Sequence, residues 1–347
     1  RAAKAERFIF LEYFILAEGK LWDELEKILC AKAREGVEVK IIFDDFGNIK
    51  RFSGETIDRL REVGVEVFIF NPVHEYVNRL HFNYRDHRKI ACIDGDVAYT
   101  GGVNIADEYA NLIERFGYWK DSGVCLEGEG AWGLTASFIR MCVNLGGVMH
   151  NEHDYYRPHT PVKSEGFCQP FTDGPQNNPD NPAEDVFLQM ISGARRFLYI
   201  TTPYFIPDES LMRALCIAGD GGVDVRLMLP GKPDHWYADC VAESYFGELI
   251  KHGVKVYRYT PGFLHGKSIM VDREAAFVGS ANMDYRSFEL DYECGVMVYS
   301  APMIESLLED MDMIVDRSHL VTAEEWAKRS VLRRVFEPLL RLFAIWM

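Results

Sequence analysis

The sequence predicts an α/β fold made of two tandem homologous domains, each a mixed β-sheet flanked by helices. Three observations support this prediction. Short apolar strands alternate with amphipathic helices, which is the order typical of sheets covered by helices. The same order of segments occurs twice, with a period of about 180 residues. The chain has 347 residues, 48% of them hydrophobic, which is enough to form two cores.

In the first half, strands and helices follow one another in a regular order. Apolar runs rich in β-branched and aromatic residues predict strands at 7–16, 37–43, 65–70, 89–94, 97–102 and near 122–128. Apolar residues at helical spacing predict helices at 20–36, 54–64, 104–112 and 130–146. The first of these helices carries its apolar residues on one face and closes at Gly36, a common stop signal.

Residues 151–186 differ in composition from the rest, because they are rich in Pro, Asn, Asp and Gly. We expect them to form a linker or loop region, one long enough to line a site as well. The order of segments then restarts, since "GGVDVRLML" matches "EGVEVKIIF" and "HGVKVYRY" matches "VGVEVFIF". The sequence therefore predicts a first domain over 1–150 and a second over 187–347, which ends in a basic amphipathic helix.

Charge and composition narrow the classes of function. The net charge of −15 argues against a broad nucleic-acid surface but is compatible with a small cationic pocket for one phosphate. No run reaches the roughly 18 apolar residues that a membrane span needs. The cysteines form no Cys-x-x-Cys pair, so we expect reduced, mostly buried thiols and an intracellular setting.

The strongest functional signal is a motif that occurs in both halves with identical spacing. On a strand, residues two apart point to the same side, so the histidine and lysine of each His-x-Lys face one place. A single His-x-Lys is more often a packed or surface pair, whereas two copies with every position retained favour a function. The members are His87, Lys89, Asp94, Gly101, Gly102 and Asn104 in the first copy, and His265, Lys267, Asp272, Gly279, Ser280 and Asn282 in the second.

These motifs resemble those of the phospholipase D superfamily, and the resemblance covers nearly the whole chain. Segments such as "NYRDHRKIACIDG", "YTGGVNIADEY" and "ITTPYFIPDESL" are most similar to bacterial cardiolipin synthases. The resemblance implies a single active site at the pseudo-twofold interface between the two domains. It also implies chemistry that uses no metal and no other cofactor.

Phosphodiester exchange without a metal needs a nucleophile, an acid for the leaving alkoxide and cations for the phosphoryl oxygens. The residue types of the two motifs meet these needs. In the superfamily the histidine of the first motif is usually the nucleophile, so the resemblance implies that His87 attacks and that His265 serves as acid and base. The residues expected at the phosphoryl oxygens are Lys89, Lys267, Asn104 and Asn282.

Carboxylates are expected to hold the second ring nitrogen of each histidine and so to fix its tautomer. The resemblance places an acidic residue some distance after each asparagine, and the candidates are Asp121 in "YWKDSG" and Glu293 in "LDYECG". The alternative is an ordinary acidic residue at a strand start. Asp94 and Asp272 follow strand ends, where we expect them to tie the turn or pair with a neighbour rather than contact substrate.

Four further residues are candidates for substrate binding. Gly102 and Ser280 precede the asparagines, where a small residue lets the backbone approach the phosphate. Tyr204 lies near a predicted strand end, although a packed aromatic is an equally good interpretation. Arg85 adds positive charge beside His87.

The predicted function is that of a cardiolipin synthase, which transfers a phosphatidyl group between two phosphatidylglycerol molecules through a phosphohistidine and releases glycerol. With water or serine as acceptor the same site would act as a phospholipase D or a phosphatidylserine synthase. The net charge disfavours a superfamily nuclease, and two intact motifs disfavour an inactive binding module.

The expected partners are phosphatidylglycerol and a membrane surface, with no nucleic acid. The basic, apolar tail at 326–347 predicts an interfacial helix or, alternatively, a helix docked on its own domain. We expect a protein of the bacterial cytoplasmic membrane whose catalytic domains face the cytoplasm and whose N-terminal membrane helices are missing from this chain. The sequence leaves the oligomeric state open.

Overall fold

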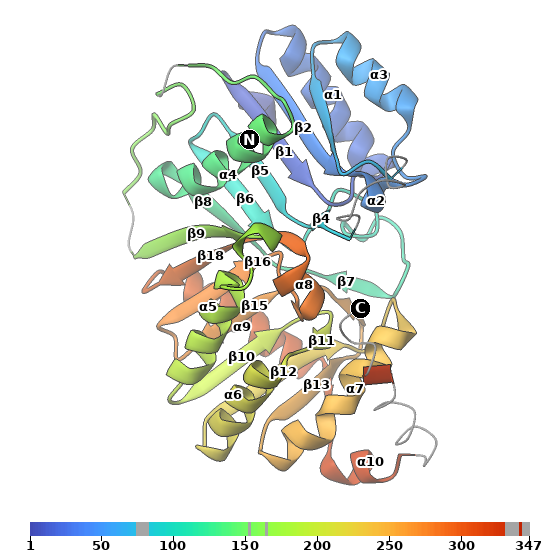
Figure 1. Cartoon of the computed structure of the whole chain (residues 1–347), viewed down its shortest axis with the longest axis vertical. Coiled ribbons are helices and arrows are strands. Elements are labelled where there is room, and N and C mark those ends of the chain that lie inside the picture. Colours follow the sequence, from blue (N-terminus) through green and yellow to red (C-terminus); the bar gives the residue numbers. More distant parts are fainter. Residues whose placement is uncertain (74–82, 152–153, 164–165, 330–339, 342–347) are drawn as a thin grey trace.

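The computed structural model describes residues 1–73, 83–151, 154–163, 166–329 and 340–341. Figure 1 shows the first half of the chain, in blue to green, above the second half, in green to red. Each half is a twisted sheet with helices packed on it, and the two sheets meet near the middle of the molecule.

The first half folds around a six-stranded mixed sheet. Its strands are β1 (Phe8–Tyr13), β2 (Glu38–Asp44), β3 (Glu66–Phe70), β5 (Lys89–Ile93), β6 (Val97–Gly101) and β8 (Gly123–Glu127). Its helices are η1 (Ala2–Lys4), α1 (Lys20–Arg34), α2 (Asp45–Asn48), α3 (Gly54–Glu62), η3 (Gly128–Ala131) and α4 (Trp132–Asn144). The strand order is β3-β2-β1-β5-β6-β8, with the first three strands parallel and the others antiparallel to their neighbours.

The second half repeats this topology within a nine-stranded sheet. Its strands are β9 (Phe167–Asp173), β10 (Phe197–Thr201), β12 (Asp224–Pro230), β13 (Lys255–Tyr259), β15 (Ser268–Val271), β16 (Ala275–Gly279), β18 (Asp291–Tyr299) and β19 (Ser318–Leu320), joined by β4 (Arg85–Asp86) of the first half. Its helices are η4 (Pro175–Asn177), α5 (Pro182–Gly193), α6 (Glu209–Asp220), α7 (Trp236–Lys251), α8 (Tyr285–Glu289), α9 (Met303–Asp316) and α10 (Ala323–Ala327). The order β13-β12-β10-β15-β16-β18 is the order of the first sheet, which confirms the predicted pair of homologous mixed sheets.

Two short ladders complete the fold near the junction of the halves. β11 (Phe205–Ile206) pairs in parallel with β17 (Met283–Asp284). β7 (Tyr118–Lys120) of the first half pairs in parallel with β14 (Gly262–Leu264) of the second. β4 and β7 are therefore two strands of the first half that pair with strands of the second half.

The two halves also share one hydrophobic core. A single buried cluster contains Phe10 of β1, Ile90 of β5 and Phe138 of α4 together with Met270 of β15 and Val296 of β18. Apolar surface buried across the junction holds the halves together, because separating them would expose it to water. The shared core therefore fixes the position of one half-motif relative to the other.

The helix predicted over 104–112 is not formed; these residues form turns and bends instead. The carboxylate of Asp107 accepts hydrogen bonds from the amides of Lys20 and Leu21 at the start of α1. The side chain of Asn111, whose φ is 54°, bonds both the amide and the carbonyl of Trp119. Hydrogen bonds from side chains to the backbone compete with the hydrogen bonds of a helix, and at 104–112 they stabilise the turns instead.

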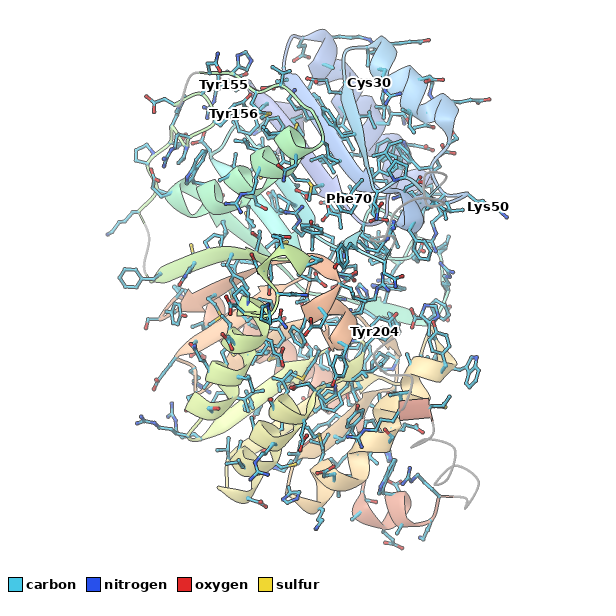
Figure 2. All side chains as sticks on the ribbon, viewed as in Figure 1. Cys30, Lys50, Phe70, Tyr155, Tyr156 and Tyr204 are labelled. Carbon is cyan, nitrogen blue, oxygen red and sulfur yellow. The ribbon has the colours of Figure 1, made fainter. Side chains whose placement is uncertain are left out.

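The segment expected as a linker, 151–186, is more ordered than its composition predicts. Tyr155 and Tyr156 hold its start on the first half, where their hydroxyls donate to the Arg7 carbonyl and the Glu38 carboxylate (Figure 2). Further on it forms β9, which pairs antiparallel with β18. The proline within β9 is tolerated because β9 is an edge strand. The domain limits at 150 and 187 stay predictions.

The amphipathic tail predicted at 326–347 lies mostly outside the described residues. α10 ends at Ala327, and farther along the guanidinium of Arg341 lies 3.7 Å from the ring centroid of Tyr245. Within the described part of the chain, no helix has both the length and the hydropathy needed to cross a membrane.

Candidate active site

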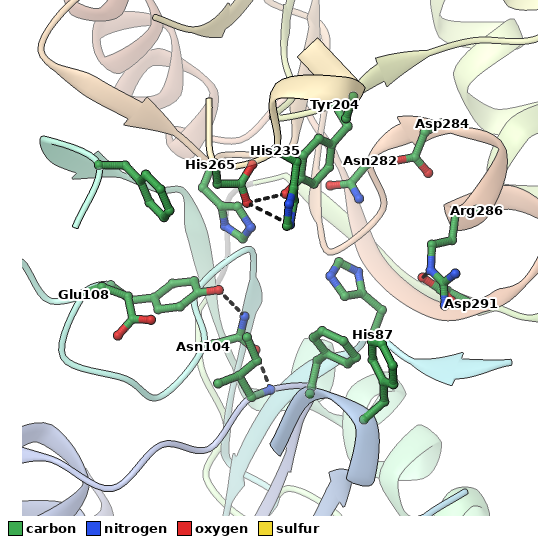
Figure 3. A pocket seen from close by; sticks show the side chains of 18 of the residues that line it. His87, Asn104, Glu108, Tyr204, His235, His265, Asn282, Asp284, Arg286 and Asp291 are labelled. Carbon is green, nitrogen blue, oxygen red and sulfur yellow. Dashed lines mark hydrogen bonds and ion pairs between the residues drawn. The ribbon is translucent and has the colours of Figure 1, made fainter. Parts of the chain in front are cut away.

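A cavity of about 560 Å³ opens between the two halves, and both motif histidines line it. Asn104 and Asn282, the asparagines of the two motifs, line it as well. Figure 3 shows the imidazoles of His87 and His265 on opposite sides of the centre of the cavity. The structure therefore brings the two half-motifs into one place.

Strand pairing between the halves sets each histidine in position. β4 pairs with the start of β18, and the His87 amide donates to the Tyr292 carbonyl at 2.9 Å. In the same way β14 pairs with β7, and the His265 amide donates to the Lys120 carbonyl at 2.7 Å. In both places the next residue of the partner strand carries a carboxylate. Each histidine is thus set beside an acidic residue of the other half.

The resulting pairs are crossed between the halves. Nδ1 of His87 lies 2.9 Å from Oε1 of Glu293, and Nδ1 of His265 lies 2.7 Å from Oδ2 of Asp121. The strand registers place Asp121 and Glu293 at equivalent positions of the repeat. Because Nδ1 faces the carboxylate, Nε2 is the ring atom of each histidine that is available to a substrate.

Lys89 and Lys267 are buried behind the histidines rather than on the cavity wall. Each ammonium donates to the carbonyl of the histidine in its own motif, Lys267 at 2.6 Å. Burial lowers the pKa of Lys89 to about 8 and that of Lys267 to about 7. A negative charge that entered the cavity would favour the charged form of both lysines.

Burial and the two lysines set the charge of the histidines. Burial comes first and the lysine charges second in lowering the pKa of both rings, that of His265 to about 4. In the free protein both imidazoles are therefore neutral at pH 7.

Burial raises the pKa of both carboxylates, but their net pKa shifts are opposite. Burial raises the pKa of Glu293 to about 7, even though Lys89 opposes this shift. For Asp121 burial also favours the neutral acid, but His265 and Lys267 outweigh it and the pKa is lowered. Asp121 is therefore ionised at pH 7, whereas Glu293 is close to its midpoint.

The two asparagines have different partners. Oδ1 of Asn104 accepts from the Ile15 amide at 3.0 Å, and its Nδ2 donates to the Tyr109 hydroxyl at 2.8 Å. Asn282 is 7% exposed, and its Oδ1 is buried without a hydrogen-bond partner. A buried acceptor without a donor is costly in free energy. Oδ1 of Asn282 is therefore available to bond a ligand, whereas Oδ1 of Asn104 is already bonded.

Gly102 and Ser280 do not line the cavity but support the carboxylates. A Cβ on Gly102 would overlap Oδ1 of Asp121 and lie 2.9 Å from the His265 carbonyl oxygen, so only glycine fits. The Ser280 hydroxyl donates to Oε2 of Glu293. The two small residues were expected at the phosphate. In the structure Gly102 instead makes room for the Asp121 carboxylate, and Ser280 bonds the Glu293 carboxylate.

Asp94 and Asp272 lie outside the cavity lining, each in a turn after a strand. The Asp94 carboxylate accepts from the amides of residues 6–8, and that of Asp272 from the amides of residues 195–197. Their φ angles are 54° and 52°, a left-handed conformation that aspartate tolerates. Each aspartate ties its turn to the segment that leads into the first strand of the half.

Tyr204 lines the cavity, and its hydroxyl donates to Oδ2 of Asp234 at 2.6 Å. Arg85 lies elsewhere, so its predicted place beside the phosphate needs correction. Its side chain is 2% exposed and reaches Oδ1 of the buried Asp44 at 3.3 Å. This ion pair draws the guanidinium into the body of the first half.

Sequence reasoning missed most of the acidic, basic and histidine side chains on the cavity wall. They are Arg51, Glu108, Arg115, Asp234, His235, Asp284, Arg286 and Asp291. The repeat offered one signal, because Glu108 and Arg286 both stand four residues after a motif asparagine and carry opposite charges. For the others no pattern in a single sequence pointed to the cavity.

The two cavity walls consequently differ in charge. On the first-half wall, Glu108 pairs with Arg115 at 3.0 Å and with Arg51 at 3.4 Å, which leaves one positive charge in excess. On the second-half wall, Arg286 pairs with Asp291 at 3.3 Å, and two further aspartates are present. An anionic group is therefore favoured on the first-half wall and disfavoured on the second.

Three side chains of the described residues offer possible metal ligands within 4.8 Å of one another: His87, Asp291 and Glu293. Two of them, His87 and Glu293, already bond each other, and Asp291 pairs with Arg286. The charges of Arg286 and both motif lysines act on His87 at this place. Because these side chains already have partners and the nearby positive charges oppose a cation, we assign no metal to this group.

Comparison with known proteins agrees with the motif and the topology. The chain matches a family model described as "Cardiolipin synthase, PLD-like domain" over residues 1–114 and 187–315. It is 37% identical over 342 residues to a cardiolipin synthase of Halalkalibacterium halodurans, covering 98% of this chain and 67% of that protein. An uncharacterized protein of Streptococcus mutans is 38% identical over 345 residues, covering 98% and 74%. The chain thus spans about two thirds to three quarters of the length of these relatives.

A solved structure shows the same fold. The phosphatidylserine synthase of Haemophilus influenzae superimposes on 99% of this chain and 88% of its own with a TM-score of 0.72 and 15% sequence identity. At this identity the likeness concerns the fold alone. The sequence relatives confirm the resemblance that the two motifs indicated.

Proposed function

The chain belongs to the cardiolipin synthase family with phospholipase D-like domains, and we propose that it transfers a phosphatidyl group from one phosphatidylglycerol to another, giving cardiolipin and glycerol. The observation that carries the proposal is the pair of crossed histidine–carboxylate contacts in one cavity. They leave Nε2 of each histidine available, which supports one histidine as the nucleophile at phosphorus and the other as the carrier of an alcohol proton.

In the first step, Nε2 of His87 bonds to the phosphorus while the bond from phosphorus to the glycerol oxygen breaks. His265 gives its proton to the departing oxygen, so free glycerol leaves and a phosphatidyl-histidine remains. His265 must be charged for this step. The anionic phosphodiester supplies the reason, because a negative charge beside His265 raises its pKa and lets it take a proton from solvent when the substrate binds.

In the second step, His265 takes the proton from a glycerol hydroxyl of the second phosphatidylglycerol. That oxygen bonds to the phosphorus, and the bond between phosphorus and His87 breaks, so both histidines return to their first state. Asn282 and the two lysines would stabilise the charge on the phosphoryl oxygens during both steps.

The carboxylates support this division of roles. The ionised Asp121 stabilises the imidazolium that His265 needs as an acid. Glu293, with its pKa raised to about 7, is partly protonated and suits a neutral His87, the form that attacks.

The test is to incubate the protein with phosphatidylglycerol vesicles and to follow the products by mass. We expect cardiolipin and free glycerol in equal amounts. Phosphatidic acid without cardiolipin would instead indicate a hydrolase, and phosphatidylserine formed on adding serine would indicate a phosphatidylserine synthase. Cleavage of a labelled oligonucleotide would contradict the expectation that nucleic acid is not a partner.

The proposal includes work at a membrane surface, because the substrate is a lipid. Exposed apolar side chains lie on segments next to the cavity-lining residues: Phe46, Ile49, Leu112, Ile113 and Trp236. The elements that carry or flank them, α2, β7 and the start of α7, lie on one side of the molecule (Figure 1). Exposed apolar side chains close to Arg51 and Arg115, which leave one positive charge in excess, are suited to insert into an anionic interface.

The membrane proposal is tested with a variant that carries Ile113→Asp and Trp236→Asp. Sedimentation with phosphatidylglycerol vesicles should fall at least tenfold, whereas Ile217→Asp on α6, equally exposed, should bind as the wild type does. Equal binding by both variants would contradict this docking surface. Cell fractionation of the full-length protein would test the expected place at the cytoplasmic membrane.

A further inference from the structure

The cavity contains a polar cluster that the proposed steps leave unused. Tyr204, Asp234 and His235 line the second-half wall. Oδ2 of Asp234 accepts from the Tyr204 hydroxyl at 2.6 Å and lies 3.6 Å from Nε2 of His235. Figure 3 shows Tyr204 and His235 with their contacts to this carboxylate.

Three oxygens on the same wall are buried and have no hydrogen-bond partner: Oδ1 of Asp234, of Asn282 and of Asp291. Asp291 is paired with Arg286 through its other oxygen, which leaves Oδ1 of Asp234 and Oδ1 of Asn282 to be explained. Both are acceptors, so the group that satisfies them must bring hydrogen-bond donors. The aspartates of this wall disfavour a phosphate or carboxylate there. The missing group is therefore a donor that is not an anion, such as a hydroxyl.

The cluster lies on the His265 side of the site. Figure 3 shows Tyr204 and His235 next to His265, and the ring centroid of Tyr109, which also lines the cavity, is 5.4 Å from that of His265. In the proposed mechanism His265 handles the proton of the leaving and attacking glycerol oxygen. The glycerol headgroup must therefore lie on this side of the phosphorus.

The geometry points to Asp234 as the hydroxyl-binding residue of a polyol subsite, which Tyr204 and His235 hold in place and which selects glycerol as the acceptor alcohol. This inference rests on the proposed function. The free oxygen of Asp234 accepts from a second hydroxyl of the glycerol while His265 deprotonates the first. Water and methanol lack that second hydroxyl, and the carboxylate of serine is repelled by the aspartates of the wall.

The test uses a phosphatidyl donor whose leaving group has no hydroxyl, phosphatidyl-p-nitrophenol, in vesicles with glycerol and methanol at equal concentration. The readout is the ratio of phosphatidylglycerol to phosphatidylmethanol, which does not depend on how fast the phosphohistidine forms. The wild type should favour glycerol. Asp234→Ala should lower the ratio at least tenfold, because the site then loses the acceptor for the second hydroxyl.

Further variants separate recognition from structure. Asp234→Asn keeps one acceptor oxygen and should restore part of the preference for glycerol. Asp220→Asn is a matched control, because Asp220 also pairs with a histidine, His252 at 2.8 Å, but lies outside the cavity lining. Its ratio should equal that of the wild type.

The outcomes distinguish the two proposals. If the wild type forms both esters but Asp234→Ala keeps the wild-type ratio, the polyol subsite is refuted and the transferase proposal stands. A wild type without preference for glycerol refutes the subsite as well. If the wild type releases no nitrophenolate and forms neither ester, the proposed function itself fails.

Discussion

The two half-sites use the same three residue types at the same spacing, but each supports its histidine differently. In one, Asp121 is ionised and touches His265, and Gly102 leaves room for its carboxylate. In the other, Glu293 has a raised pKa, touches His87 and accepts from Ser280. A duplicated scaffold can thus give two identical side chains opposite tasks by changing the carboxylate behind each and the residue that supports it.

The largest effect is expected from the histidines themselves. His87→Ala and His265→Ala should each lower cardiolipin formation by about 10³-fold or more, because a nucleophile or a proton carrier is lost. The two variants should differ in the trapped intermediate. His265→Ala should still form a phosphohistidine with phosphatidyl-p-nitrophenol, whose leaving group needs no proton, whereas His87→Ala should form none. Equal labelling of both would refute the assignment of roles.

Exchanging the carboxylates for amides sharpens the comparison. Asp121→Asn should lower kcat by about 10²-fold or more, because an ionised partner of the acid is lost. Glu293→Gln should cost only about tenfold, since a neutral amide resembles the partly protonated acid that is already present. Steady-state kinetics on vesicles would measure both losses. A larger loss for Glu293→Gln would reverse the proposed roles.

Exchanging the small residues tests how each carboxylate is supported. Gly102→Ser should be destabilising by about 1–3 kcal/mol and should reduce activity, because the new side chain overlaps Asp121. Ser280→Gly should cost only about 1 kcal/mol, because it removes hydrogen bonds to Glu293 and the Cys294 backbone without any clash. Denaturant unfolding would compare the two variants. Equal stability losses would contradict this difference between the half-sites.

The last effect concerns acid stability rather than activity at pH 7. The pKa of both histidines is lowered from about 6.5, that of His265 to about 4, so below pH 6.5 the unfolded chain takes up protons that the folded protein does not. Each histidine should therefore lower the free energy of unfolding by about 1–2 kcal/mol between pH 6.5 and pH 5, while Glu293, whose pKa is raised, contributes in the opposite direction. His265→Asn and His87→Asn should each make this fall shallower. An unchanged slope in both would contradict the neutral, buried imidazoles.

Much of the fold could be predicted from the sequence because its signals are local and repeated. Alternating apolar segments gave the order of strands and helices, and the duplication gave two sheets of one topology. The segment at 104–112 failed because helical periodicity does not reveal that Asp107 and Asn111 bond distant backbone groups. The strand β9 was missed because its partner, β18, is far along the chain.

As with the fold, the parts of the site that lie in the repeated motif could be predicted, and the parts that depend on tertiary contacts could not. Histidines, lysines and asparagines stand at fixed spacing in both copies, so the motif alone pointed to them. The crossing of the pairs was not visible, because it depends on β4 and β7 joining the opposite half. Arg85 was misplaced because its pairing with Asp44 is a tertiary contact. Asp234 is in no motif, and only its orphaned oxygen in the folded cavity marks it.

The strands exchanged between the halves have a consequence for how the protein could be assembled. Residues 160–163 are exposed, Tyr156 before them packs on the first half, and β9 after them belongs to the second sheet. A chain cut there would give two fragments, each holding one histidine and the carboxylate that serves the other. Neither fragment could be active by itself, and joint expression should rebuild the whole site by fragment complementation.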